Sequence, residues 1–242
     1  MTGLNALILG ATGATGKHLL QELLASPQYA NVSEYGRRVT PAERITAGKG
    51  KLEQKVIDFE KLDEAELKDK RWDVVFITLG TTHKQAGSAA AFEKIDREYV
   101  VNAARAAKSD DPNHPQRLLY LSSIGADPAA SSLYPKSKGL TERELAKLGY
   151  NDTVIFRPAV LGTEREDSRP LEHVAQGVSR LLSTFSSRIY MPVPTLAKVM
   201  RDVGAVGSAK LPSGTVQQMG DSATPFSCLN NSAILAIADS FS

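Results

Sequence analysis

Short apolar runs alternate with amphipathic stretches through the first two thirds of this chain. The apolar runs have the length of buried strands, and the stretches between them carry apolar residues at helical spacing. Strands that alternate with helices in this way form a parallel sheet with helices on both faces, so the pattern predicts a doubly wound α/β fold. The predicted strands cover residues 6–9, 32–35, 55–58, 73–78, 117–122 and 152–157, and the clearest helices cover 17–24 and 91–101.

The pattern changes after Pro158. Residues 162–190 are rich in charged residues and serine, and the prolines within 191–194 end any helix that precedes them. We expect a single domain over residues 1–242, in which 162–215 form a small substrate-facing lobe. A further helix is predicted over 195–206 and a last strand around 215–217.

Composition narrows the class of protein. With 242 residues, of which 42% are hydrophobic, the chain can build one α/β domain with a sizeable core. Its 29 basic and 27 acidic residues nearly balance, which gives no reason to expect a nucleic-acid partner. No apolar run approaches the roughly 20 residues that span a bilayer. The first predicted strand begins too early to leave room for a signal peptide, so a cytoplasmic protein is predicted.

Metal and disulfide chemistry have little support in the sequence. Cys228 is the only cysteine, which excludes an internal disulfide and a thiolate metal cluster. The four histidines have no metal-ligand spacing. No metal site is therefore predicted.

A glycine-rich turn follows the first predicted strand and opens the first predicted helix. Its glycines let the backbone approach a pyrophosphate closely, and free N–H groups at the start of the helix face the negative charge. The turn therefore predicts a dinucleotide site, although the same glycines could also mark only a flexible turn. The predicted contacts are Gly10, Thr12, Gly13, Ala14, Thr15 and Gly16.

Arg37 and Arg38 follow the second predicted strand, at the corner where an NAD-binding protein normally carries an acidic residue. The nearest acid, Glu34, is expected within the strand and turned away from the ribose. Two guanidiniums suit the 2′-phosphate of NADP, because each offers a planar fork of donors to a dianion. NADPH is therefore the predicted cofactor, with a solvated basic turn as the alternative. Asp58 and Phe59 follow the third strand, where they either flank the adenine or pack in the core.

The remaining predicted cofactor contacts follow the fourth and sixth strands. Leu79, Gly80 and Thr81 offer a floor of small residues, where the backbone can pass close to the cofactor. Pro158 comes directly after the sixth strand. Because the carboxyl ends of parallel strands meet at one edge of the sheet, we expect these residues beside the glycine-rich turn.

Tyr134 and Lys138 have the Y-x-x-x-K spacing. Positions i and i+4 share one face of a helix, so the phenol and the ammonium lie side by side, and the ammonium favours the phenolate form. Such a tyrosine can pass a proton to a carbonyl oxygen, and the lysine can also hold the nicotinamide ribose hydroxyls. Ser122 and Ser123 end the fifth strand, where a hydroxyl can polarise a substrate carbonyl; Ser123 is slightly preferred. Each element alone has an ordinary structural explanation, but their order along the chain predicts a catalytic site.

These motifs together resemble the Tat-interacting-protein oxidoreductases of animals and fungi, an atypical family of short-chain dehydrogenases and reductases. The resemblance implies a Rossmann-type fold and NADPH binding. It also implies a protein partner, because the animal members are better known as regulators. The fungal members are associated with mitochondrial membranes, so the resemblance offers that location as an alternative. His83-Lys84 departs from the Arg-Gly pair expected there. The resemblance covers about residues 4–206 and rests on segments 10–16, 35–38, 79–82, 94–100, 121–127, 134–138, 156–161 and 166–170.

Two functions stay open from the sequence. The first is an NADPH-dependent reductase of a small carbonyl compound, with Ser123, Tyr134 and Lys138 as its active residues. The second is an NADPH-binding interaction protein with little or no turnover, whose partner binds around Glu164 to Arg169. We prefer the reductase, because an interaction role places no demand on the tyrosine–lysine spacing. No exposed apolar stripe indicates an oligomer.

Overall fold

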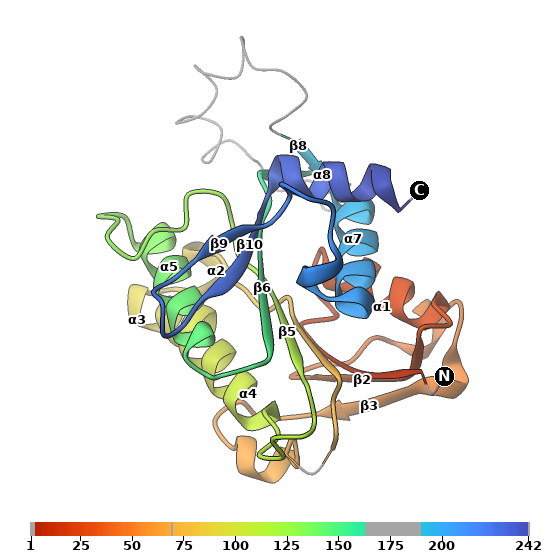
Figure 1. Cartoon of the computed structure of the whole chain (residues 1–242). Helices are drawn as coiled ribbons and strands as arrows, with labels where there is room; N and C mark the ends of the chain where they lie inside the picture. Colours follow the sequence, from red (N-terminus) through yellow and green to blue (C-terminus); the bar gives the residue numbers. More distant parts are fainter. Residues whose placement is uncertain (1–2, 69, 163–189, 242) are drawn as a thin grey trace.

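The computed structural model describes residues 3–68, 70–162 and 190–241, and its centre is an eight-stranded sheet (Figure 1). The strand order is β3-β2-β1-β4-β5-β6-β10-β9, and all neighbours are parallel except β9, which runs antiparallel to β10. The order reverses between β1 and β4, the kind of position at which doubly wound sheets bind ligands. The predicted doubly wound, Rossmann-type sheet is confirmed. The strands are β1 Leu4–Leu9, β2 Tyr29–Gly36, β3 Leu52–Val56, β4 Val74–Ile77, β5 Arg117–Leu121, β6 Asp152–Arg157, β9 Gln217–Met219 and β10 Phe226–Asn230.

Helices cover both faces of the sheet (Figure 1). One face packs against α1 (Gly16–Ala25), α7 (Val193–Val206) and α8 (Asn231–Ser240). The other face packs against α4 (Tyr99–Ala107) and α5 (Leu133–Ala146). The remaining elements are short: α2 His83–Ala86, α3 Ala89–Glu93, a π-helical turn Lys94–Glu98, the parallel pair β7 Val160–Gly162 and β8 Tyr190–Pro192, and 3₁₀ turns Ala42–Arg44, Lys49–Lys51, Leu62–Ala65 and Ser208–Lys210.

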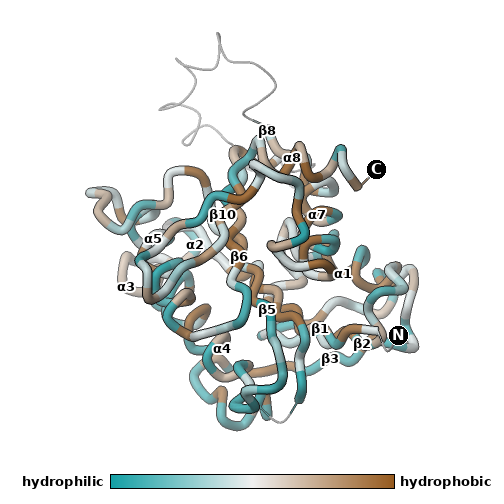
Figure 2. The backbone as a smooth tube through the Cα atoms, viewed as in Figure 1, coloured by the Kyte–Doolittle hydropathy of each residue, from teal (hydrophilic) through white to brown (hydrophobic). Residues whose placement is uncertain are grey.

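The core lies on both sides of the sheet. Along β1, Ala6 and Ile8 face the α1 side, whereas Leu7 and Leu9 face the α4 side, and all four are almost fully buried. Figure 2 shows hydrophobic residues along the central strands. Burial of each such leucine or isoleucine contributes about 1.5–3 kcal/mol, so the central strands are the most strongly stabilised part of the sheet.

The sequence pattern places most elements correctly. β6 has the predicted bounds. The third strand begins three residues earlier and ends two residues earlier than predicted, because Ile57 and Phe59 already belong to the connection that turns into the core. The last strand of the prediction is β9, shifted by two residues, and β10 was missed. β10 carries a serine, a cysteine and an asparagine among its five residues, so it lacks the continuous apolar run of the other central strands.

The predicted substrate-facing lobe over 162–215 stays a prediction. Residues 163–189 lie outside the described part of the chain. Within the described remainder, α7 packs against α1 and contributes Leu196, Met200 and Val203 to the core. This helix therefore belongs to the layer that covers the sheet.

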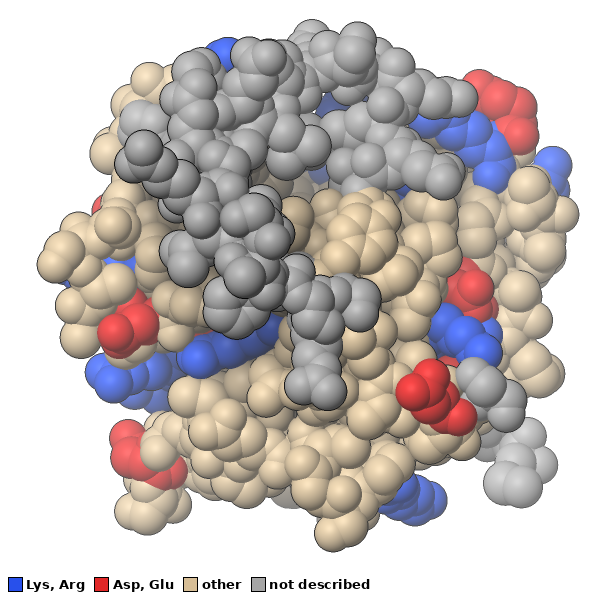
Figure 3. All heavy atoms as spheres, turned by 90° about the horizontal axis from the view of Figure 1, so that it is seen from above, with Lys and Arg blue, Asp and Glu red and all other residues tan. Residues whose placement is uncertain are grey.

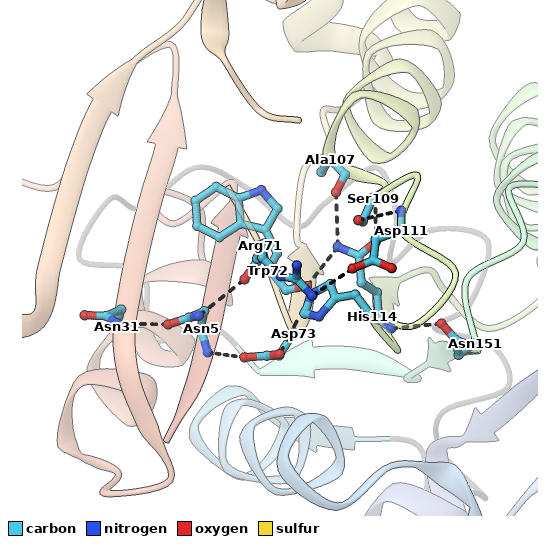
Figure 4. Close-up of polar contacts among 11 residues, drawn as sticks. Asn5, Asn31, Arg71, Trp72, Asp73, Ala107, Ser109, Asp111, His114 and Asn151 are labelled. Carbon is cyan, nitrogen blue, oxygen red and sulfur yellow. Dashed lines mark hydrogen bonds and ion pairs between the residues drawn. The ribbon is translucent and has the colours of Figure 1, made fainter. Parts of the chain in front are cut away.

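A polar network joins the amino ends of four central strands (Figure 4). The Asn5 backbone N–H donates to the Asp73 carboxylate at 2.7 Å, at the start of β1 and just before β4. The fully buried Gln116, before β5, donates from its side chain to the Trp72 carbonyl at 2.8 Å. Its backbone N–H donates to the Asn151 side chain at 2.9 Å, before β6. The network fixes the register of these strands at the edge opposite to the glycine-rich turn.

Candidate dinucleotide and active site

The turn between β1 and α1 is built so tightly that only glycine fits at two of its positions. Gly10 has a positive φ of 97°, and a Cβ there would lie 2.8 Å from the Leu79 backbone nitrogen. A Cβ on Gly16 would lie 2.1 Å from the Gly10 carbonyl oxygen. The N-cap residue of α1, Thr15, makes no side-chain cap hydrogen bond, and the first turn carries no acidic residue. The start of α1 can therefore accept an anion.

Replacing Gly16 with alanine is expected to destabilise the protein and to abolish dinucleotide binding together. The added methyl group would clash with a backbone carbonyl, which cannot rotate away, so we expect a loss of about 1–3 kcal/mol or more in the free energy of unfolding. Thermal unfolding and NADPH titration check both effects. Gly50→Ala is the matched control, because its Cβ would meet no atom within 4 Å. A Gly16→Ala protein with the melting temperature and NADPH affinity of the wild type would contradict this description of the turn.

The basic corner after β2 is free to bind an anion. Arg37 and Arg38 are exposed, and neither makes an ion pair with any residue in the described part of the chain. As predicted, Glu34 is buried inside β2. Its carboxylate accepts hydrogen bonds from the backbone N–H and the hydroxyl of Thr40 at 2.8 and 2.7 Å, and from the Gln54 amide at 2.7 Å. Glu34 therefore anchors the loop that presents the two arginines.

The residues after β3 differ in their availability. Asp58 is exposed, and its carboxylate accepts a hydrogen bond from the Glu60 backbone N–H at 2.9 Å. Phe59 is buried, and its ring stacks on Tyr99 with 5.3 Å between the centroids. This geometry favours the packing alternative for Phe59 and leaves Asp58 as the accessible candidate for the adenine.

Tyr134 and Lys138 lie on one face of α5, as the spacing predicts. Tyr134 is 44% exposed in the first turn, with its ring 6.0 Å from that of Phe92. Lys138 is buried, and its Nζ lies 5.9 Å from the centroid of the Tyr134 ring. The ammonium donates to Tyr120 Oη at 2.9 Å and lies 3.1 Å from Asp96 Oδ1. Burial opposes the charge, but Tyr120, Asp96 and Tyr134 hold the pKa of Lys138 above its usual value.

The two adjacent serines have different surroundings. Ser122 is buried, and its hydroxyl donates to Glu142 Oε1 at 2.5 Å. Glu142 in turn accepts a hydrogen bond from Arg157 Nε at 2.9 Å and forms an ion pair with this arginine. The Ser122 hydroxyl is therefore already bonded to the carboxylate of a buried ion pair. Ser123 is partly exposed, and its acceptor among the described residues is the neighbouring Ile124 carbonyl, at 3.3 Å. This difference favours Ser123, the serine that is slightly preferred from the sequence, as the accessible hydroxyl.

The segments after β4, β5 and β6 lie next to the glycine-rich turn and α5. Gly80 lies close to Lys138, since a Cβ at this position would be 3.8 Å from Nζ, and the adjacent Leu79 touches Gly10. The Pro158 carbonyl accepts from the Ile124 backbone N–H at 2.9 Å, which ties it to the loop that carries Ser123. Thr81, in contrast, bonds only to the neighbouring Thr82 carbonyl among the described residues.

Sequence reasoning missed several residues that hold the site together. Gly139 lets the loop after Ser123 pack directly on α5, because a Cβ there would lie 2.3 Å from the Pro128 nitrogen. A glycine in the middle of a predicted helix was the available signal. The partners of the other missed residues are distant in sequence, so no local signal identifies these contacts; the residues are Asp96, Tyr120, Glu142 and Arg157.

The surface around these elements carries no strong field of one sign. In Figure 3 the basic and acidic side chains are interspersed around an uncharged centre. Across residues 3–68, 70–162 and 190–241, no helix is long and apolar enough to cross a bilayer. Over the same ranges, no three His, Cys, Asp or Glu side chains gather where they could hold a metal ion. Two shallow hollows lie elsewhere, one beside Thr215 and one beside Asn151.

Comparison with known proteins identifies the family of this chain. Residues 10–190 match a family model described as NAD(P)H-binding. The chain is 38% identical over 201 residues to Protein HTATIP2 of Rattus norvegicus, which covers 83% of this chain and 81% of that protein. It is 33% identical over 185 residues to the mitochondrial protein fmp52 of Aspergillus niger, with 76% and 77% covered.

Solved structures share the fold at low sequence identity. A UDP-N-acetylglucosamine 4-epimerase from Methanobrevibacter ruminantium has a TM-score of 0.62 at 18% identity, covering 86% of this chain and 74% of its own. A short chain dehydrogenase family protein from Francisella tularensis has a TM-score of 0.61 at 12% identity, covering 86% and 93%. Proteins of different activity thus share this doubly wound sheet.

Proposed function

Because this chain belongs to the NAD(P)H-binding family of HTATIP2 and fmp52, an atypical branch of the short-chain dehydrogenases and reductases, we propose that it is an NADPH-dependent reductase of a small carbonyl compound. The observation that carries the proposal is the placing of Tyr134 over the buried Lys138, which itself adjoins Gly80 and hence the glycine-rich turn. An interaction protein would have no need of a phenol and an ammonium at this place.

The residues present fit a phosphorylated dinucleotide. Side chains at Gly10 and Gly16 would clash with the backbone of the turn, and the start of α1 has no acidic residue that would repel a pyrophosphate. Arg37 and Arg38, which make no ion pair among the described residues, supply two guanidiniums for a 2′-phosphate. The cofactor, when bound, supplies a hydride for the carbonyl carbon.

The chain's own residues complete the reduction. The Tyr134 hydroxyl donates its proton to the carbonyl oxygen, so hydride and proton together give the alcohol. Ser123 donates a hydrogen bond to the same oxygen and stabilises the negative charge that develops on it. Lys138 binds the nicotinamide ribose and stabilises the phenolate that remains on Tyr134.

The experiment that tests the proposal measures NADPH binding by fluorescence and NADPH consumption over a broad panel of aldehydes, ketones and conjugated carbonyl compounds. Consumption with one class of carbonyl supports the reductase. Binding without consumption would favour the NADPH-binding interaction protein instead. The surface expected to bind its partner, Glu164 to Arg169, lies outside the described residues.

We further propose a cytoplasmic location. The fungal relatives are named mitochondrial, so a mitochondrial association is the alternative. Fractionation of cells that express the full chain separates the two, and recovery of the protein with mitochondria would overturn the cytoplasmic proposal.

Replacing Arg37 with alanine is expected to weaken NADPH binding while NADH binding changes little. The loss of one charge-assisted hydrogen bond to the 2′-phosphate corresponds to about 1.5–3 kcal/mol, or roughly ten- to hundred-fold in the dissociation constant. Titration calorimetry with both cofactors checks this. Arg105→Ala, which removes an exposed arginine on α4, controls for the change in net charge. Equal weakening of both cofactors would show that Arg37 does not contact the 2′-phosphate.

A further inference from the structure

Asp96 is a buried carboxylate that has no part in the proposed reduction. It lies in the π-helical turn between α3 and α4 and is fully buried. Neither carboxylate oxygen has a hydrogen-bond partner within the described residues, and Lys138 Nζ, 3.1 Å from Oδ1, is its ion-pair partner there. Burying a charge is costly unless it is paired. π-Helical turns are rare in proteins, and those that occur are often found at functional sites. Both facts call for a reason to keep an acid here.

The partner of Asp96 has a fixed number of donors. An ammonium carries three N–H groups. Tyr120 Oη takes one at 2.9 Å, and the Asp96 carboxylate faces a second. With these two neighbours, one N–H of the ammonium remains for a further acceptor. A Cβ at the exposed Gly80 would lie 3.4 Å from Asp96 Oδ1, so a glycine here keeps the space above the pair open.

We propose that Asp96 is a positioning residue for Lys138: its carboxylate keeps the ammonium charged and oriented, so that the remaining N–H faces the nicotinamide ribose and Tyr134. Asp96 acts through Lys138 and has no contact with the substrate. The role of the oriented N–H in binding the cofactor rests on the proposed function. The effect of Asp96 on the charge of Lys138 concerns only these two side chains and can be measured without turnover.

The charges around Lys138 give the expected direction of change. Tyr120 on β5 and Tyr134 on α5 are phenols, and Asp96 is the carboxylate that contacts the ammonium among the described residues. The neighbouring Arg97 is directed to Glu93 and Glu144, at 3.7 and 3.6 Å. Burial lowers the pKa of a lysine. If the Asp96 charge is removed, only the two phenols oppose this effect on Lys138. The Lys138 ammonium should therefore lose its proton at a lower pH.

The deciding experiment follows Lys138 directly by NMR of protein labelled at the lysine side chains, without cofactor. The Lys138 signal is assigned by its absence in Lys138→Met. In the wild type it should show no titration up to about pH 10. In Asp96→Asn the signal should titrate below that pH, while the matched control Glu93→Gln, an exposed carboxylate on α3, leaves the wild-type behaviour unchanged. An identical Lys138 signal in Asp96→Asn and wild type would overturn the inference.

NADPH titration separates the inference from the proposed function. In Asp96→Asn, NADPH binding should be weaker and should decline by about ten-fold as Lys138 loses its proton, whereas wild-type binding stays level over the same pH range. A wild-type protein that binds no NADPH would overturn the proposed function, and the NMR result would still decide on Asp96.

A second variant covers the case in which Asp96→Asn does not fold. Tyr120→Phe removes the other partner of the ammonium and leaves Asp96 in place. By our inference Lys138 should then stay charged up to about pH 10, because the carboxylate alone supplies the counter-charge. Titration of Lys138 well below that pH in Tyr120→Phe would show that the phenol, and not Asp96, holds the charge.

Discussion

Tyr134→Phe is expected to lower the rate of carbonyl reduction by about 10²- to 10⁴-fold, while NADPH binding and thermal stability stay at wild-type values. The variant loses only the hydroxyl that we propose as the proton donor. The side chain is 44% exposed, and its contacts in the described part of the chain, with Phe92 and Lys138, are made by the ring and stay available to phenylalanine. NADPH consumption with the best carbonyl of the panel, measured beside the NADPH dissociation constant and the melting temperature, checks all three statements.

Tyr190→Phe is the matched control for this result. Tyr190 is likewise an exposed tyrosine, 52% accessible, but it lies on β8, paired with Val160 of β7, and not on α5. Loss of its hydroxyl should leave turnover within about two-fold. Wild-type turnover in Tyr134→Phe would exclude this tyrosine as the proton donor. Weaker NADPH binding in the same variant would instead assign it to cofactor binding.

Arg157→Met is expected to lower the free energy of unfolding by about 3–5 kcal/mol at neutral pH, the largest effect on stability that we predict. The substitution leaves the Glu142 carboxylate, whose side chain is 1% exposed, without its cation. Ser122 alone then remains as its hydrogen-bond donor within the described structure. Urea denaturation followed by circular dichroism measures the loss.

Two further variants test whether the cause is the unpaired charge. Lys68→Met breaks an ion pair with Asp110 in which both side chains are more than half exposed, and it should cost less than about 1 kcal/mol. Arg157→Met combined with Glu142→Leu removes the stranded charge and should recover most of the loss. If the double variant is as unstable as Arg157→Met alone, the arginine stabilises the fold by packing and not by its charge.

The fold could be predicted because its signals are local. The apolar run of β1 and the glycines behind it lie next to each other in the chain, and the i, i+4 relation of Tyr134 and Lys138 holds on any helix. β10 could not be predicted from its own hydrophobic pattern. Its polar residues, such as Ser227, are buried by neighbouring strands that sequence spacing does not reveal.

The supporting contacts of the site could not be predicted in the same way. Ser122 and Glu142 are 20 positions apart, and only the packing of α5 against the end of β5 brings them together. Glu142 does follow Lys138 by four positions, so its place on the same helix face was available as a signal, but its partners were not. Asp96 lay within a segment of the family resemblance, and nothing local connects it with Lys138, 42 positions later.

The network at the amino ends of β1, β4, β5 and β6 bears on how proteins of this kind diversify. Strands of four to six residues separate it from the opposite edge by roughly 13–20 Å. Loops at the opposite edge can therefore accumulate changes while the register of the sheet is held elsewhere. An epimerase and a short chain dehydrogenase family protein share this fold with the chain at only 18% and 12% identity. New substrate preferences in this family should therefore arise from exchanges at one rim of the sheet, at little cost to the ability of the chain to fold.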